Sequence, residues 1–141
     1  MKTKKLGNNG LEVSALGWCL LPCPVIMENM AKNIVKAMTE TGVKKVIFIS
    51  SIEIYDTPLK PVLKPYRKAA DVLEASALDY TILRPAWFTN TNEVDYEITR
   101  KGEPEKGSVI SQKSLATFIT KIIQNPEKYS RESLGINKPT S

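Results

Sequence analysis

The chain has 141 residues, of which 42% are hydrophobic and 25% charged, and this composition is that of one small globular domain. It excludes a disordered tail and a multidomain enzyme. The net charge of +5 comes from basic residues scattered along the chain, without the basic stripe and interleaved aromatics of a nucleic-acid interface. Histidine is absent, which excludes His-based acid/base catalysis, Ser/His/Asp triads and most zinc sites. We therefore expect no nucleic-acid partner.

The two cysteines, Cys19 and Cys23, have no second pair to complete a zinc site, so we expect free thiols and no bound metal. No apolar run reaches the roughly 20 residues that span a bilayer. The longest one, residues 16–26, is interrupted by Pro22 and Pro24, and no small-residue cleavage site follows it. We expect no membrane partner and a cytoplasmic location.

The N-terminal residues predict a β-hairpin. Asn9 and Gly10 supply the positive φ angles of a tight turn, and residues 2–6 and 11–16 are its arms. From Met27 the pattern becomes helical, and Gly42 marks the end of this first helix.

The middle of the chain predicts alternating strands and helices. Residues 46–49 form a short continuous apolar run, typical of a strand covered on both faces in a parallel sheet. A second helix over about 66–77 has a small inner face that includes Ala77, and residues 80–83 predict another buried strand. This order implies right-handed crossovers and an α/β fold.

The last third predicts a short hairpin or loop over 96–110, with Gly102 and Gly107 as turn residues. A helix with Ser111 as its N-cap follows, and Pro126 stops it. Residues 134–137 predict a terminal strand. The carboxylates of the loop have no apolar pocket in the sequence pattern, so we expect them to be solvated: Asp95, Glu97, Glu103 and Glu105.

Three stretches of residues 28–139 carry a resemblance to a known family. They are residues 42–51, ending in Ile-Ser-Ser; residues 75–88, which contain the specific run Leu-Asp-Tyr-Thr-Ile-Leu-Arg-Pro; and residues 111–116. These stretches resemble the C-terminal part of atypical short-chain dehydrogenase/reductases, which are NAD(P)H-binding Rossmann-like proteins. The resemblance implies an incomplete Rossmann-like parallel sheet flanked by helices over residues 27–141.

Residues 1–17 resemble instead the opening hairpin of aldo-keto reductases, through Leu6-Gly7-Asn8-Asn9-Gly10 and the residues that follow. The remaining chain has no room for the barrel of that family. We therefore expect residues 1–26 to be a hairpin and connecting segment, joined to the reductase-like part by gene fusion or deletion.

The Gly-rich turn that holds a dinucleotide pyrophosphate is missing, because Gly7, Gly10 and Gly17 do not have the required spacing. What the resemblance leaves is the nicotinamide end of the site, and it implies a set of cofactor-binding residues: Ser50, Ser51, Ile52, Tyr66, Pro85, Ala86, Trp87 and Phe88. Two alternatives stay open. The serines either bond a carboxamide or cap the strand end, and the two aromatics either stack on the ring or belong to the core.

Catalytic residues are not identified. Reductases of this kind use a Tyr with a Lys four residues on, but Tyr66 has Ala70 at that offset, and Lys68 lies only two residues away. A structural or binding role suits Tyr66 better.

The sequence thus predicts a truncated NAD(P)H-binding, oxidoreductase-type protein that binds its cofactor weakly or with a partner. The family resemblance favours NADP over NAD. The alternative is a noncatalytic self-associating module or a fusion remnant. Loss of the first strands leaves residues 46–49 as an apolar sheet edge, so we expect residues 11–26 or a second copy of the chain to cover it.

Overall fold

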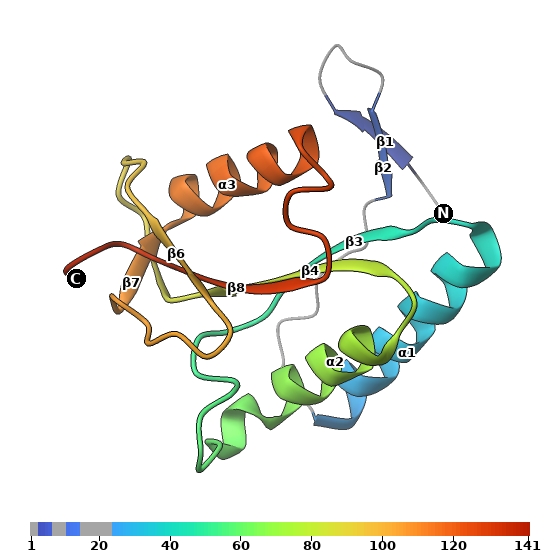
Figure 1. The fold of residues 1–141 in the computed structure, drawn as a ribbon, viewed down its shortest axis with the longest axis horizontal. Coiled ribbons are helices and arrows are strands. Elements are labelled where there is room, and N and C mark those ends of the chain that lie inside the picture. Colours follow the sequence, from blue (N-terminus) through green and yellow to red (C-terminus); the bar gives the residue numbers. More distant parts are fainter. Residues whose placement is uncertain (1–2, 7–10, 15–23) are drawn as a thin grey trace.

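The computed structural model describes residues 3–6, 11–14 and 24–141. It has an α/β fold in three layers, with the sheet between helices (Figure 1). Strands β1 (Thr3–Leu6) and β2 (Leu11–Ser14) pair antiparallel, with Leu6 opposite Leu11, as predicted for the hairpin arms. The turn at Asn9 and Gly10, the two cysteines and most of the apolar segment 16–26 lie outside the described residues. The division between residues 26 and 27 stays a prediction.

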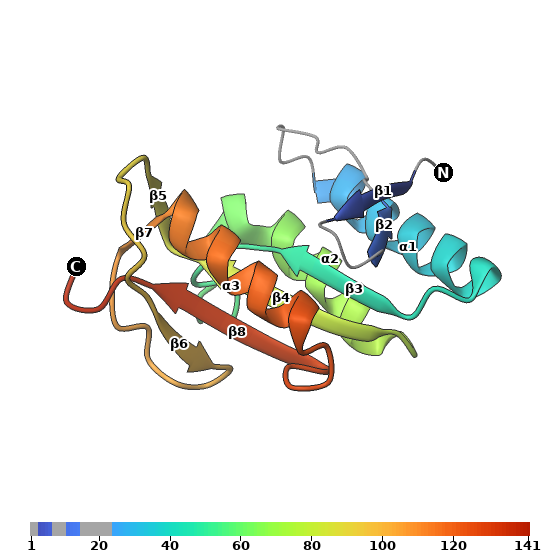
Figure 2. The same ribbon diagram turned by 90° about the horizontal axis from the view of Figure 1, so that it is seen from above.

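The main sheet has the order β3-β4-β8-β6, formed by Lys45–Ile49, Asp79–Pro85, Glu132–Asn137 and Glu97–Arg100. The first three strands are parallel, and β6 runs against β8. In Figure 2 the arrows of β3 and β8 point the same way and that of β6 points the opposite way. The predicted α/β sheet and its terminal strand are therefore confirmed. Because parallel strands end at the same edge, the residues after β3, β4 and β8 are gathered there.

Helices α1 (Pro24–Thr41) and α2 (Lys64–Ala75) lie side by side on one face of the sheet, and α3 (Gln112–Gln124) lies on the other. The first helix ends where predicted, at Gly42, whose φ of 72° is the left-handed conformation that glycine adopts readily. The second follows a 3₁₀ turn, Pro61–Leu63, and ends two residues before Ala77, which is exposed instead of lying on the inner face.

The third helix has the predicted cap and core face. The Ser111 side chain accepts a hydrogen bond from the Ser114 N–H at 2.9 Å, which satisfies one of the free donors of the first turn. Its apolar stripe, which includes Leu115, Phe118 and Ile122, is buried against β4 and β8. On the opposite face, Leu73 and Ile82 belong to a second core beneath α2.

Of the two alternatives predicted for residues 96–110, a hairpin or a loop, the hairpin is wrong. Strand β6 pairs with β8, whereas β7 (Val109–Ser111) pairs parallel with β5 (Trp87–Thr89) in a separate two-stranded sheet. Strands β6 and β7 pair with strands that are distant in the sequence, because β8 and β5 each have an edge with no other partner strand. Gly102 does occupy a turn, with a φ of 92°.

The edge strand β3 is less buried than predicted. All five of its residues are half-buried, although Val46 and Phe48 contact one core and Ile47 and Ile49 the other. Within the described part of the chain, no strand pairs with its outer edge. Among the helices of this part, none combines the length and apolar character that a membrane crossing requires.

Candidate functional site

The chain leaving β3 runs along the carboxyl end of β4. The Ser50 N–H donates to the Leu83 carbonyl at 2.7 Å, and the Ile52 N–H donates to the Pro85 carbonyl at 3.1 Å. These two bonds hold residues 50–52 beside residues 83–85, just before Trp87. In open α/β sheets this edge is where ligands bind.

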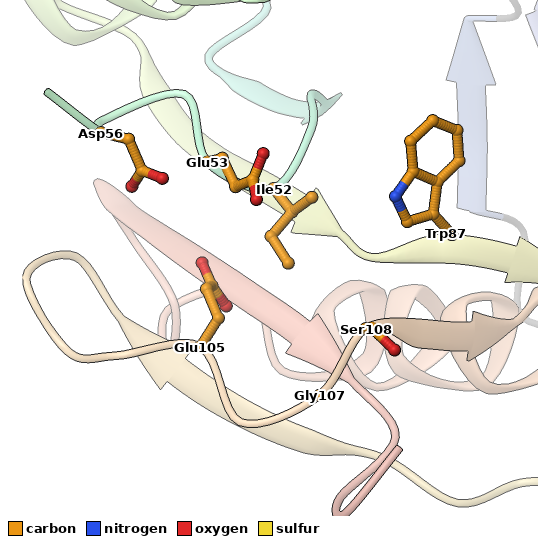
Figure 3. Close-up of a pocket in the computed structure, with 7 residues that line it drawn as sticks. All are labelled: Ile52, Glu53, Asp56, Trp87, Glu105, Gly107 and Ser108. Carbon is orange, nitrogen blue, oxygen red and sulfur yellow. The ribbon is translucent and has the colours of Figure 1, made fainter. Parts of the chain in front are cut away.

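A cleft of about 330 Å³ opens at this edge (Figure 3). Three separate segments line it: Ile52, Glu53 and Asp56 from the loop after β3, Trp87 from β5, and Glu105, Gly107 and Ser108 from the loop before β7. The backbone N–H of Trp87 donates to the Ser108 carbonyl at 3.0 Å and so joins two of these segments. The Trp87 side chain is 77% exposed, which leaves its indole available to a ligand.

The predicted cofactor-binding residues fall into three groups. Ile52 and Trp87 line the cleft, and Ser50 and Ser51 lead into it. Pro85 and Ala86 are buried immediately before Trp87, and Phe88 is half exposed. Tyr66 lies on α2 against the second core and does not line the cleft. The roles of these residues in binding stay predictions.

Glu105 is not the solvated carboxylate that we expected. It accepts a hydrogen bond from Arg84 Nη1 at 2.5 Å and another from Thr99 Oγ1 at 3.0 Å. The Arg84 and Glu105 side chains are only 5% and 19% exposed, so this is a buried ion pair. The sequence signal that we missed was Arg84 itself, a cation within a strand of buried residues that needed a counter-charge.

Gly135 makes room for this ion pair. It stands opposite Arg84 in the register of β4 and β8, and a Cβ at this position would collide with Thr99 Oγ1 and with the Glu105 carboxylate. Any side chain on β8 here would therefore push Glu105 off the sheet.

Several buried polar atoms near the cleft have no hydrogen-bond partner within the described residues. They are Ser50 Oγ, Nε and Nη2 of Arg84, and both amide atoms of Asn137. The Asn137 Nδ2 lies 3.1 Å from where a Cβ on Gly107 would stand, which places it behind the cleft wall. Unsatisfied buried polar groups are uncommon and often accompany a functional site.

The remaining carboxylates of the cleft differ in their surroundings. Glu53 has a left-handed backbone, with a φ of 66°, and forms an ion pair with Lys60. Within the described part of the chain, Asp56 has no hydrogen bond or ion pair to its side chain. No group of acidic side chains in this part has the arrangement of a metal site.

Tyr55 supports the loop that carries Ile52, Glu53 and Asp56. Its hydroxyl donates to the Glu74 carboxylate and accepts a hydrogen bond from the Ser133 hydroxyl, with 3.1 Å between the two oxygens. Burial, together with the hydrogen bond to Glu74, raises the pKa of Tyr55 well above its usual value. Burial also disfavours the ionised Glu74, but hydrogen bonds from Lys101 and Tyr55 outweigh it and lower the pKa of Glu74.

We expect Tyr55→Phe to change how stability depends on pH. The folded pKa of Tyr55 is raised, so its contribution is complete below ~10, the pKa of an unfolded tyrosine, and is lost as the pH rises further. Urea unfolding at pH 8 and pH 11 measures this loss. It should be smaller in Tyr55→Phe than in the wild type, whereas Tyr129→Phe is the control that removes another tyrosine hydroxyl. Equal losses in Tyr55→Phe and the wild type would contradict the role of Tyr55.

Comparisons with known proteins bear on the family and the fold of the chain. A family model described as NAD(P)H-binding matches residues 9–126. Its match begins inside the segment that resembles aldo-keto reductases, and the comparisons give that resemblance no support. No curated protein matches the chain.

Solved structures resemble the chain over most of its length. A Rossmann-fold NAD(P)-binding family protein from Shigella flexneri is 46% identical, with a TM-score of 0.74 over 82% of this chain and 56% of that one. A short-chain dehydrogenase/reductase from Veillonella parvula, solved in complex with NADP, is 25% identical, with a TM-score of 0.73 over 84% of this chain and 60% of that one.

ChuY, an anaerobillin reductase from Escherichia coli O157:H7, is 15% identical, with a TM-score of 0.69 over 82% of this chain and 60% of that one, and shares the fold. The chain thus spans about three fifths of the length of these proteins.

Proposed function

Since the chain belongs to the NAD(P)H-binding family, we propose that its cleft receives the nicotinamide end of NAD(P)H and that the protein is of the oxidoreductase type. The observation that carries this proposal is the meeting of Ile52, Trp87 and Ser108 around one cleft at the carboxyl ends of parallel strands. A nicotinamide cofactor supplies hydride chemistry, which the side chains of this protein do not provide.

The lining of the cleft suits one end of the cofactor and not the other. The exposed indole of Trp87 offers a flat apolar surface to a ring, and Ile52 adds an aliphatic side chain; Ser50 Oγ, two residues before Ile52, is buried and has no hydrogen-bond partner within the described residues. The ionisable side chains of the lining are all carboxylates, which repel phosphates. This composition supports a nicotinamide subsite, with the pyrophosphate outside the cleft.

We propose that cofactor binding is weak or depends on a partner. The 141 residues contain no Gly-rich turn that would cradle the pyrophosphate with backbone N–H groups. Among these residues, the nicotinamide end then carries the affinity. Whether NAD or NADP is preferred depends on contacts with the adenosine end, and the family resemblance favours NADP.

The chain's own residues orient the ring and do not form a complete proton-transfer pair. Trp87 presents a stacking face and Ser108 a hydroxyl, while Ser50 and Ser51 offer hydroxyls at the end of β3. Tyr66 lies apart from the cleft and lacks a lysine four residues on. A proton donor for a carbonyl substrate would therefore come from another group of the cleft or from the substrate.

Tryptophan fluorescence tests the proposal. The chain has two tryptophans, Trp18 and Trp87, so each single Trp→Phe variant reports on the other. We expect NADPH to quench the tryptophan fluorescence of the wild type and of Trp18→Phe. The quenching should exceed the apparent loss that NADPH causes by absorbing light, which is measured with a free tryptophan derivative. In Trp87→Phe this extra quenching should be absent. The midpoint temperature of thermal unfolding should rise with millimolar NADPH, since a ligand stabilises the state that it binds.

Absence of both responses would contradict cofactor binding by this chain alone.

The second candidate is a noncatalytic self-associating module, favoured by the half-buried apolar strand β3 and its outer edge, which has no partner strand within the described residues. Concentration-dependent sedimentation without any nucleotide response would support that candidate.

A further inference from the structure

The charged side chains that line the cleft are all negative. Its lining includes the carboxylates of Glu53, Asp56 and Glu105 and no basic side chain. The cations that pair with Glu53 and Glu105 are Lys60 and Arg84, and neither belongs to the lining. A ligand in the cleft therefore meets carboxylate oxygens first.

Asp56 differs from the other two carboxylates because its charge is not compensated. Within the described residues its side chain forms no ion pair and no hydrogen bond, and only its backbone N–H bonds, to the Glu53 carbonyl at 3.1 Å. In Figure 3 it faces the cleft from the end opposite Trp87, with Ile52 between them. An indole face and an uncompensated carboxylate both attract a cation.

We propose that Asp56, together with Trp87, makes the cleft bind the oxidised nicotinamide cofactor more tightly than the reduced one. This inference rests on the proposed function. The oxidised ring is a pyridinium that carries one positive charge, whereas the reduced ring is neutral, and the rest of the molecule is identical. The difference in affinity between the two forms therefore isolates the interaction of the ring charge with the cleft.

The size of the effect follows from solvent screening. A carboxylate that shares a water-exposed cleft with a unit charge changes the affinity for that charge by up to about threefold, and an exposed cation–π contact contributes about threefold. We expect the oxidised form to bind about threefold to tenfold more tightly. Because Asp56 is exposed, added salt should reduce its share of this ratio.

The preference also has a chemical consequence. Groups that hold the charged ring more tightly than the neutral ring favour loss of hydride from the reduced cofactor. By thermodynamic linkage, the cleft would make the reduced cofactor a stronger hydride donor by the same factor as the ratio of affinities. The carboxylates would thus favour reduction of a substrate.

The test compares the dissociation constants of NADP⁺ and NADPH, and of NAD⁺ and NADH, for the full chain by isothermal titration calorimetry. Asp56→Asn keeps the size of the side chain and removes its charge, and Asp56→Lys reverses the charge. Glu127→Gln is the control. It is an exposed carboxylate beside Pro126, whose carbonyl bonds Lys45 at the start of β3, so it lies at the end of the strands opposite the cleft.

We expect the wild type and Glu127→Gln to share one ratio in favour of the oxidised form. The ratio should fall about threefold in Asp56→Asn and further in Asp56→Lys, while the melting temperatures without ligand stay close to that of the wild type. Equal affinities of the wild type for the two forms, or tighter binding of the reduced form, would overturn the inference. So would an unchanged ratio in both Asp56 variants. Binding of neither form would contradict cofactor binding by this chain alone, and with it the premise on which the inference rests.

Discussion

Replacement of Glu105 by glutamine is expected to lower the free energy of unfolding by about 3 kcal/mol, because it leaves the buried Arg84 guanidinium without its counter-charge. Arg84 already has two nitrogens, Nε and Nη2, without partners in the described structure, so it has no second acceptor that compensates for the loss. Urea denaturation at neutral pH measures the change. The effect should exceed that of removing an ordinary surface charge, which is within about 0.5 kcal/mol.

Two further variants separate the ion pair from other effects. Glu103→Gln changes an exposed carboxylate of the same loop and should leave stability nearly unchanged. The double variant Arg84→Met with Glu105→Gln removes both charges and should recover about half of the loss or more, since a buried pair replaced as a whole costs little. A double variant less stable than Glu105→Gln alone would mean that Arg84 contributes mainly through packing against Tyr55, over which its guanidinium lies at 5.3 Å.

Replacement of Phe118 by alanine is expected to lower the free energy of unfolding by about 3 to 5 kcal/mol. Phe118 is 1% exposed at the centre of the core beneath α3, with ring centroids 5.6 Å from Tyr96 and 5.2 Å from Tyr129. Its removal deletes buried apolar surface and leaves a cavity between two aromatic rings. Chemical denaturation followed by circular dichroism provides the measurement.

The same substitution at Phe88 is the matched control. Phe88 is 50% exposed, so Phe88→Ala should cost less than about 1 kcal/mol. A small effect at Phe118 would show that the core collapses around the missing ring. A large effect at Phe88 would show that this side chain is buried in solution, against another part of the chain or a second copy.

Local patterns were enough to predict the three helices and the parallel strands of the main sheet. The helix after Ser111 combines a side-chain cap with an apolar stripe at helical spacing, and both are properties of neighbouring residues. Residues 46–49 and 80–83 are apolar runs that form parallel strands. The three-residue strands β5 and β7 and the pairing of β6 with β8 depend on partners far away in the sequence, so no local pattern revealed them.

The cleft was predictable only in part for the same reason. Resemblance to a family pointed to Ile52 and Trp87, because both adjoin strand-end motifs that the sequence carries. Asp56 and Glu105 belong to two polar loops that meet only in the folded chain. A charged loop looks solvated in sequence, and only the demand of a buried Arg84 for a partner distinguishes Glu105 from its neighbours.

The absence of a side chain at Gly135 places a condition on how this sequence varies. A side chain there would occupy the space of the Glu105 carboxylate, which in turn neutralises Arg84. Three positions on β4, β8 and a distant loop are therefore not free to mutate one at a time. In homologues with alanine or a larger residue at position 135, we expect the acid at position 105 and the arginine at position 84 to be replaced with it, so that the three columns of an alignment covary.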